Sequence, residues 1–446
     1  MEKTKLSRRF FLALILFSLI GQIAWVVENM YFNVFIYKMF HADASDISLM
    51  VAASAIAATF TTLFIGALSD KLGRRKLFIC GGYILWGISI LSFALIRTDV
   101  IEKVFPMAAS AASVGVTLVI IMDCVMTFFG SSANDACFNA WLTDSTDASN
   151  RGTAEGINAM MPLLAILVVF GGFMPFDLDK SESWVYIYLI IGAVVLLSGI
   201  AGIFLIRDPA AKTDNRENYF ANIFYGFRPS VVRENRTLYA SLAAFSVFGI
   251  SIQIFMPYLI LYYSVSLGMD NYVLIMAPAI LIAAACTLLF GRLYDKLHFK
   301  KTILPALTLL AVGYLLLYFF RATLPVFLGS MLMMCGYLAG MAVFGAMLRD
   351  HTPAHRAGQF QGLRIVGQVL IPGIIGPAIG AAVLKNADTL LGDDGTTSFI
   401  PNQNIFLAAL IAAVFILPIL AGVFALVRKE TAEKAQKNTE SGEKNA

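Results

Sequence analysis

Long apolar runs occupy most of this chain of 446 residues. Hydrophobic residues make up 59% of the chain and charged residues 14%, whereas soluble proteins have about 45 to 50% apolar and about 25% charged residues. A hydrocarbon core of about 30 Å is crossed by about 20 helical residues. Runs of that length or more lie at about 10–39, 46–69, 77–96, 107–142, 153–175, 184–206, 237–266, 272–294, 302–320, 324–348, 358–384 and 403–427. Because lipid leaves no partner for open backbone groups, the pattern predicts an all-α membrane protein with about twelve transmembrane helices.

A charged motif occurs twice, each time between two apolar runs. Residues 66–76, Gly-Ala-Leu-Ser-Asp-Lys-Leu-Gly-Arg-Arg-Lys, reappear as residues 291–301, Gly-Arg-Leu-Tyr-Asp-Lys-Leu-His-Phe-Lys-Lys. A second match relates residues 144–152, after the fourth run, to residues 350–358, after the tenth. Two similar halves that move about a shared midplane site are typical of transporters.

The longest polar interruption divides the twelve runs six and six. We therefore expect two pseudo-symmetric six-helix bundles and four segments. These are an N-terminal bundle over 1–206, a cytoplasmic linker over 207–236, a C-terminal bundle over 237–428 and a tail over 429–446. The tail has little apolar content to bury and is expected to be disordered.

The distribution of cations predicts the orientation. With the amino terminus inside, about 26 of the 33 Lys and Arg residues fall in the termini and inner loops, and only Arg364 falls in a span. Both termini are therefore expected in the cytoplasm, in an integral protein of the plasma (inner) membrane. The net charge of +4 reflects this orientation, so nucleic acid is not an expected partner. The five cysteines lie in spans without metal spacing, and neither a metal nor a cofactor is predicted.

Four ionisable residues fall inside the predicted spans: Glu28, Asp123, Asp135 and Arg364. A charge at the bilayer centre costs about 2.5 kcal/mol or more, so such residues usually line a cavity and act on substrate or ion. At about 1.5 Å per residue, Glu28 and Asp123 share one depth, and Asp135 and Arg364 share another nearer the cytoplasm. We expect the first pair to carry ion coupling and the second to form an ion pair across the two halves. Neutralising an acid is the expected role of Arg364, and binding an anionic substrate group is the alternative.

The residues around these acids suit a sugar-like ligand, because an aromatic ring stacks on a sugar face while carboxylates and amides bind hydroxyl groups. Trp25, Glu28 and Asn29 share one face of the first helix. At about 100° per residue, Asp123, Thr127, Asn134, Phe138 and Trp141 form a stripe on the fourth, with Asp135 about 120° away. The predicted substrate residues are Trp25, Glu28, Asn29, Asp123, Thr127, Asn134, Gln253 and Gln368. Packing or lipid contact for Trp25, and a structural pair for Glu28, are the alternatives.

Residues 70–76 resemble the most recognisable loop of the major facilitator superfamily, and the resemblance covers nearly the whole chain. Residues 348–362 and 371–377 are similar to glycoside-pentoside-hexuronide cation symporters and related sucrose-type carriers. The resemblance implies that Asp70 holds an inner gate near Arg356 and Arg364, and that Asp295 does the same near Arg151. An aspartate can do this by pairing with an arginine or a helix amino terminus. The residues predicted to gate are Asp70, Arg74, Asp135, Arg151, Asp295, Arg356 and Arg364. For the cations, simple enforcement of orientation is the alternative.

All four histidines lie in loops or at span ends, so a carboxylate must carry any coupling. The second span, unlike that of melibiose-type members, contains no acid over 47–69, which favours protons over sodium. The leading hypothesis is a monomeric, proton-coupled (less favourably sodium-coupled) symporter of a sugar or glycoside. The alternative is a proton-antiport exporter of drug-like cations. An enzyme is not expected, because no span carries a nucleophile with a base, a phosphate loop or a metal cluster.

Overall fold

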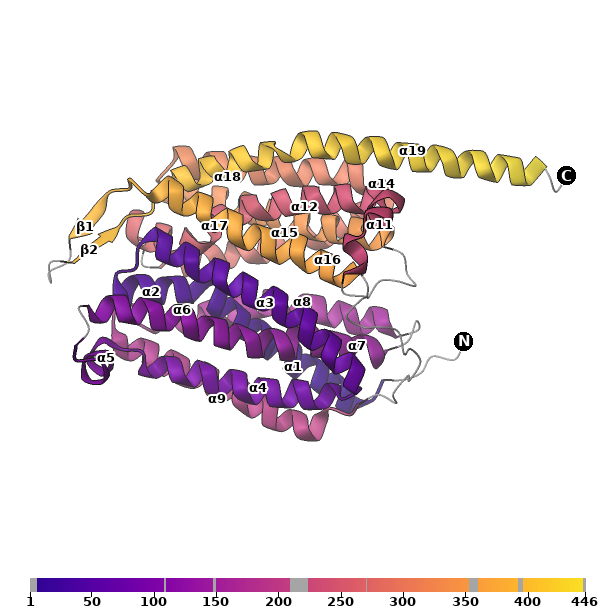
Figure 1. Cartoon of the computed structure of the whole chain (residues 1–446). Helices are drawn as coiled ribbons and strands as arrows, with labels where there is room; N and C mark the ends of the chain where they lie inside the picture. The colour runs from indigo at the N-terminus through magenta and orange to yellow at the C-terminus, as the bar shows by residue number, and fades with distance from the viewer. Residues whose placement is uncertain are drawn as a thin grey trace. The chain divides into compact units, whose positions relative to one another are not determined.

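The computed structural model describes residues 6–107, 110–146, 150–208, 224–269, 271–352, 360–391 and 396–443, which are overwhelmingly helical (Figure 1). Eleven helices within these ranges are long and apolar enough to cross a membrane. One of them, α14 (Val273–Phe319), has 47 residues and leaves the helical conformation at His298. Its length of about 70 Å is about twice a hydrocarbon core, so it comprises two spans. The predicted all-α, twelve-span fold is confirmed.

The first six spans follow the predicted order. The first, third and fourth spans are each built from consecutive helical segments that differ in their hydrogen-bond pattern. Their elements are α1 (Arg8–Val26), η1 (Val27–Tyr31) and α2 (Phe32–Phe40); α3 (Ala44–Leu72); α4 (Arg75–Ser92) and η2 (Phe93–Leu95); α6 (Ala111–Gly130), η3 (Ser131–Phe138) and α7 (Asn139–Asp144); α8 (Arg151–Phe173); and α9 (Ser181–Leu205). A short helix, α5 (Thr98–Val104), lies between the third and fourth spans.

The second six spans are interrupted in a similar way. Besides α14, their elements are α12 (Arg236–Phe255), η5 (Met256–Tyr258), α13 (Leu259–Leu261) and η6 (Tyr262–Ser266); α15 (Thr323–His351); α16 (Gln361–Ile365), η8 (Val366–Leu370) and α17 (Ile371–Leu384); and α18 (Asn404–Val414) and α19 (Ile416–Glu443). Two short elements, η4 (Tyr225–Phe227) and α11 (Pro229–Glu234), precede them. Strands β1 (Thr389–Leu391) and β2 (Thr397–Phe399) pair antiparallel between α17 and α18 (Figure 1).

Helix ends show why the sequence divides where it does. Asp43 caps α3 by accepting the Asp46 amide at 2.9 Å, and the Asp46 carboxylate accepts the Asp43 amide in return. The same helix ends at Gly73, whose φ of 63° is open to glycine. The equivalent position of the repeated motif is His298, which adopts φ 58° and ψ 178°. Both copies of the motif therefore turn at a residue with positive φ, but only the first has glycine there.

The chain folds as two compact units that mix the sequence halves. The first unit comprises Met1–Phe220, Phe255–Ala277 and Gly373–Ile405. The second comprises Ala221–Ile254, Pro278–Pro372 and Phe406–Ala446. In the first unit, the Tyr37 hydroxyl donates to the Phe399 carbonyl at 2.6 Å, which joins the first span to strand β2. The division into two halves at a linker over residues 207–236 remains a prediction.

Large apolar side chains lie on the outside of the helices, as a lipid-embedded protein requires. Phe60, Phe204 and Leu288 are among the exposed ones, while Glu28 and Asp123 are buried. In water such extensive apolar exposure would be costly, and in lipid it is not. The chain therefore buries its polar groups and exposes its apolar ones over the spans.

The predicted tail differs from the structure over the described residues, because α19 continues to Glu443. Residues 429–443 contain no proline and several good helix formers, including alanine, glutamate, lysine and glutamine. A helix already formed in the last span can extend into such a sequence without a new nucleation step.

Candidate functional site

Glu28 lies at the meeting point of three spans of the first unit. Its Oε1 accepts a hydrogen bond from the Ser54 hydroxyl at 2.7 Å and another from the Thr127 hydroxyl at 2.8 Å. The two hydroxyl oxygens are themselves 2.8 Å apart. Glu28 is only 7% exposed. The carboxylate thus ties η1 of the first span to α3 of the second and α6 of the fourth.

Asp123 belongs to the same cluster, one turn before Thr127 on α6. The Ser54 hydroxyl and the charge of Glu28 both act on its carboxyl group, and Asp123 is 2% exposed. Glu28 Oε2 and Asp123 Oδ1 are buried without a hydrogen-bond partner. None of the ion pairs found among the described residues includes either acid. Two adjacent carboxylates without a countercharge repel each other when both are ionised, so a proton or cation between them is stabilising.

Among the described residues, widened helical turns with π-type hydrogen bonding occur at four places, in the first, fourth, seventh and eleventh spans. They are η1, η3, η6 and η8. Three of them contain predicted site residues: Glu28 in η1, Asn134 and Asp135 in η3, and Gln368 in η8. Such turns are frequent at functional sites, and they contain more residues per turn than an α-helix. The 100° count used on the fourth span therefore fails beyond Gly130.

Asn134, in the widened turn of the fourth span, has hydrogen-bond partners on two other spans. Its amide nitrogen donates to the Tyr83 hydroxyl at 2.6 Å and to the Phe17 carbonyl at 3.4 Å. The Tyr83 hydroxyl also donates to Phe17, at 2.7 Å. A Cβ at Gly21 would lie 2.1 Å from the Asn134 amide nitrogen, so only glycine fits there. Asn134 therefore braces the first, third and fourth spans, and the predicted single stripe does not describe its surroundings.

Asp135 instead lies near Trp25 of the first span. Its Oδ2 accepts the Ser131 hydroxyl at 2.9 Å. The indole nitrogen of Trp25 interacts with the Asp135 carboxylate but has no partner at hydrogen-bond geometry. The indole ring packs against Trp86, with centroids 5.0 Å apart. Arg364, the predicted partner of Asp135, belongs to the second unit, and their ion pair remains a prediction.

The other predicted residues of the first unit have varied surroundings. Asn29 is exposed, and its amide donates to the Trp25 carbonyl of its own helix at 2.7 Å. Phe138 and Trp141 are buried and stacked on each other, with centroids 5.7 Å apart. These two aromatic rings therefore serve packing. Of the aromatic residues predicted to form the site, Trp25 is the one that is only half-buried.

The predicted residues of the second unit lie on α12, α16 and η8. The Ser246 hydroxyl donates to the Gly367 carbonyl at 2.6 Å, so Gln368 lies at the level of Ser246. Gln253 lies about 10 Å further along α12. Both glutamines are half-buried. The buried Nε of Arg364 has no hydrogen-bond partner, which leaves a donor of the guanidinium unused.

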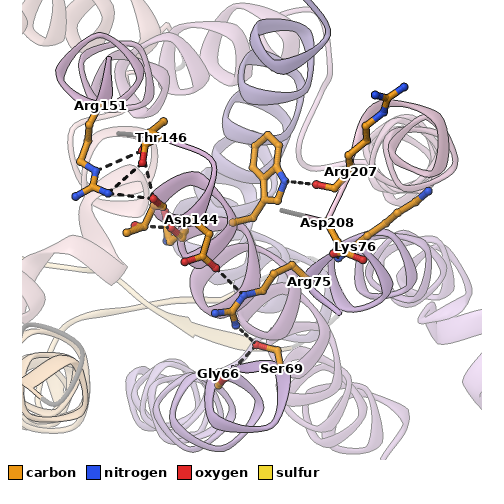
Figure 2. Close-up of polar contacts among 12 residues, drawn as sticks. Gly66, Ser69, Arg75, Lys76, Asp144, Thr146, Arg151, Arg207 and Asp208 are labelled. Carbon is orange, nitrogen blue, oxygen red and sulfur yellow. Dashed lines mark hydrogen bonds and ion pairs between the residues drawn. The ribbon is translucent and has the colours of Figure 1, made fainter. Parts of the chain in front are cut away.

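An ion pair in the first unit, at the end of the helices that carries the charged motif, was not predicted from the sequence. Arg75 is 9% exposed and donates through Nε to Asp144 Oδ2 at 3.3 Å (Figure 2). Its Nη1 donates to the Ser69 hydroxyl, which donates in turn to the Gly66 carbonyl at 3.0 Å. The carboxyl ends of α3 and α7 and the amino end of α4 are thereby joined. The signal available in the sequence was the match of the two Asp-containing segments after the fourth and tenth spans.

The second unit holds the corresponding acid differently. Asp144 corresponds to Asp350, and Ser69 corresponds to Tyr294 of the repeated motif. The Tyr294 hydroxyl donates directly to Asp350 Oδ2 at 2.6 Å. In the second unit, therefore, the tyrosine hydroxyl contacts the aspartate directly. In the first unit the serine at the equivalent position reaches the aspartate only through the arginine between them.

The predicted gating residues are only partly described. Arg356 and the side chain of Asp70 lie outside the described part of the chain. Arg74 and Asp295 are exposed. Arg151 donates through Nη2 to the Thr143 carbonyl at 3.1 Å and to the Thr146 carbonyl at 3.3 Å, where a cation stabilises the carboxyl end of α7 (Figure 2). Gating by these residues remains a prediction.

Twelve spans, several with ionisable side chains inside them, are typical of a membrane transporter. The chain belongs to the Major Facilitator Superfamily, whose family model matches residues 10–363 and 279–446. Among curated proteins, none matches the sequence. The narrower likeness to glycoside and sucrose carriers remains a prediction.

Solved structures resemble the chain over nearly its whole length. The nucleoside transporter NupG is 14% identical, with a TM-score of 0.64 over 93% of this chain and 98% of its own. The partially occluded, inward-open xylose transporter XylE from E. coli is 14% identical, with a TM-score of 0.66 over 92% and 98%. An inward-facing bacterial homologue of the human lysosomal transporter Spinster is 14% identical, with a TM-score of 0.67 over 95% and 98%. At such identities the likeness establishes the fold.

Proposed function

We propose that this chain is a secondary active symporter that carries a sugar or glycoside together with protons by alternating access. The observation that carries the proposal is the buried pair Glu28 and Asp123, which has two unpartnered carboxyl oxygens and, among the described residues, no cation in contact. A group so placed needs a proton or an ion to remain inside a dry protein.

The composition of the cluster favours a proton over a metal cation. Ser54 and Thr127 supply hydroxyl groups, and the second span contains no acid over residues 47–69. Hard cations such as Ca²⁺ and Mg²⁺ take six or more oxygen ligands, whereas these four side chains place only a few oxygens around one point. A single proton shared between two carboxyl groups satisfies both without further ligands. Sodium is the alternative that transport measurements must exclude.

Two further observations support a sugar or glycoside as substrate. Trp25 is a half-buried aromatic ring beside Asp135, and exposed Asn29 lies one turn away on the same helix. Aromatic faces and acceptor groups together suit polyhydroxylated rings. Structures of the same fold include a xylose transporter, a D-xylose-proton symporter and a nucleoside transporter, all of whose substrates contain a sugar ring.

Protonation gives the site a physical reason to couple the two solutes. With both acids ionised, closing the protein around the site would bury uncompensated charge, which costs several kcal/mol. With one proton bound, the mutual repulsion of the carboxylates is removed. Closure around substrate is then cheaper for the protonated protein than for the ionised one, so the two solutes move together.

The test uses the purified full-length protein in proteoliposomes with an imposed pH gradient. Labelled xylose, sucrose, methyl glucoside and uridine are offered with and without a protonophore, and with sodium or potassium as the only metal cation. We expect accumulation of at least one sugar-containing substrate that is abolished by the protonophore and indifferent to sodium. Protonophore-resistant, sodium-dependent accumulation would contradict proton coupling. Expulsion of tetraphenylphosphonium without any sugar uptake would instead favour a cation exporter.

Three variants separate coupling from binding. Glu28→Gln and Asp123→Asn should lose accumulation driven by the pH gradient while retaining exchange of labelled for unlabelled substrate, because exchange requires no net proton movement. Glu102→Gln is the matched control, since Glu102 is an exposed acid on α5. Full accumulation by both site variants would exclude these acids as the proton carriers.

A further inference from the structure

We infer that strand β2 is a latch that holds one end of the spans closed. The latch consists of Ser398 and Phe399 of β2 together with Tyr37 and His41 at the end of the first span. This inference rests on the proposed alternating access, in which the two sequence halves move against each other. It names the contact that must release before this end of the protein opens.

The latch lies at the end of the spans away from the repeated charged motif. The chain reverses direction at each connection, so connections after odd-numbered spans lie at one end and those after even-numbered spans at the other. His41 follows the first span and β2 follows the eleventh, whereas the two copies of the motif follow the second and eighth spans. A contact between His41 and β2 therefore closes only the end opposite the motif.

Two neighbouring residues of β2 contact the first span. The Tyr37 hydroxyl donates to the Phe399 carbonyl at 2.6 Å, and the two rings meet edge to face with centroids 5.2 Å apart. Beside them, His41 Nδ1 lies 3.0 Å from Ser398 Oγ. Tyr37 and Phe399 are only 4% and 8% exposed. Separation of β2 from the first span therefore uncovers a buried aromatic pair and breaks two polar contacts.

Strand β2 is also joined to spans of the second sequence half. It directly precedes α18, which begins the twelfth span. The Phe399 ring packs against the Tyr258 ring of the seventh span, with centroids 6.2 Å apart. Further along the seventh span, the Ser266 hydroxyl donates to the Pro401 carbonyl, just after β2. Because β2 is fastened to the seventh and twelfth spans, we expect it to move with the second half and to leave Tyr37 and His41 behind.

The contacts that close this end are of a kind that breaks and forms again in each transport cycle. Besides the latch, the Tyr258 hydroxyl donates to the Ala44 carbonyl, at the start of the second span, at 2.9 Å. Hydroxyl, imidazole and carbonyl groups all exchange a protein partner for water, so each such hydrogen bond contributes only modestly to the closed state. Burial of the Phe399 ring adds an apolar contribution. Several modest contacts together keep the end closed and still allow it to open.

The test forms a disulfide across the latch in the full-length protein. His41→Cys and Ser398→Cys are combined in one variant, reconstituted in proteoliposomes and oxidised with copper phenanthroline. Uptake is measured with the sugar that wild type accumulates most among xylose, sucrose and methyl glucoside. A disulfide permits little separation of the two residues that it joins. We therefore expect oxidation to lower proton-driven uptake by at least about tenfold, and dithiothreitol to restore it.

The matched control combines Lys38→Cys and Asp179→Cys. These side chains form an ion pair at the same end of the spans, but both belong to the first six spans. Oxidation of this pair should leave uptake within about twofold of the reduced protein, because no movement of the halves separates it. A second latch pair, Tyr37→Cys with Phe399→Cys, decides the result if the first pair is inactive before oxidation.

Three results overturn the latch. They are continued uptake after a latch disulfide has formed, failure of both latch pairs to form a disulfide, and equal inhibition by the control disulfide. Absence of proton-driven sugar accumulation in wild type would instead overturn the proposed symport function, and the latch pairs would still form their disulfides. The two failures are therefore distinguishable in one set of proteoliposomes.

Discussion

The Thr127 hydroxyl donates to Glu28 Oε1 at 2.8 Å, which links the widened turn of the first span to the fourth span. Both residues are buried, at 1% and 7% exposure, and the contact lies in the first unit. The acid therefore depends on a neighbouring span for its orientation, and this dependence can be measured.

Replacing Thr127 by valine removes this hydroxyl while preserving the shape of the side chain. A hydrogen bond to a charged group contributes about 1.5 to 3 kcal/mol, so we expect proton-driven uptake to fall by about tenfold or more and its pH profile to shift. Thr59→Val is the control, because Thr59 is equally buried and donates to the Ala55 carbonyl of its own helix. Equal effects of the two substitutions would show that the Glu28 contact has no special role.

His298→Gly should stabilise the protein. His298 adopts φ 58° and ψ 178°, a region that costs a non-glycine residue about 1 to 3 kcal/mol. Glycine loses about 0.5 to 1 kcal/mol more chain entropy on folding, so relief of strain wins by about 1 kcal/mol. Thermal unfolding in detergent measures the change. Gly73→Ala, at φ 63° in the other copy of the motif, should be destabilising; a destabilised His298→Gly variant would argue against strain.

Gly21→Ala should destabilise the first unit by about 1 to 3 kcal/mol or more, because the new methyl group would overlap Asn134 and the Tyr83 hydroxyl, at 2.1 and 2.6 Å. Gly81→Ala is the comparison, since a Cβ there meets nothing within 4 Å and alanine favours the helix. The difference in melting temperature between these two variants measures the cost of disturbing the Asn134 contacts. Similar melting temperatures of the two variants would mean that the first, third and fourth spans can adjust around the new methyl group without loss of stability.

Arg75→Ala and Arg74→Ala should differ although the two arginines are adjacent. Arg75 is buried and contacts Asp144 and Ser69, so its loss leaves an uncompensated polar cluster and should cost about 1 to 3 kcal/mol. Asp144 is 43% exposed, which places the ion-pair contribution at the lower end of this range. Arg74 is exposed, and its loss should change stability by less than about 0.5 kcal/mol. A slower transport rate in Arg74→Ala with unchanged unfolding would support its predicted gating role.

The long apolar runs and the repeated motif were sufficient to predict the spans, because their signals are local. Hydrophobic length decides whether a helix crosses lipid, and the second motif marks the boundary inside α14 at which His298 turns the backbone. Asp43 and Gly73, at the ends of α3, likewise carry recognisable capping signals.

The internal geometry of the site was less accessible to sequence reasoning. The widened turn over Ser131–Phe138 is not marked by any residue pattern that we recognised in the sequence. It gives Asn134 partners inside the bundle and brings Asp135 beside Trp25. Similarly, Arg74 and Arg75 are chemically identical, and only the phase in which α4 begins after Gly73 decides which of them is buried.

The two copies of the inner motif hold their acids with different chemistry. A guanidinium contacts Asp144 in the first unit, whereas a neutral phenol contacts Asp350 in the second. Salt screens the attraction between opposite charges and has little effect on a hydrogen bond from an uncharged donor. Ionic strength therefore distinguishes between the two copies of the motif: added salt weakens the contact at Asp144 more than the contact at Asp350.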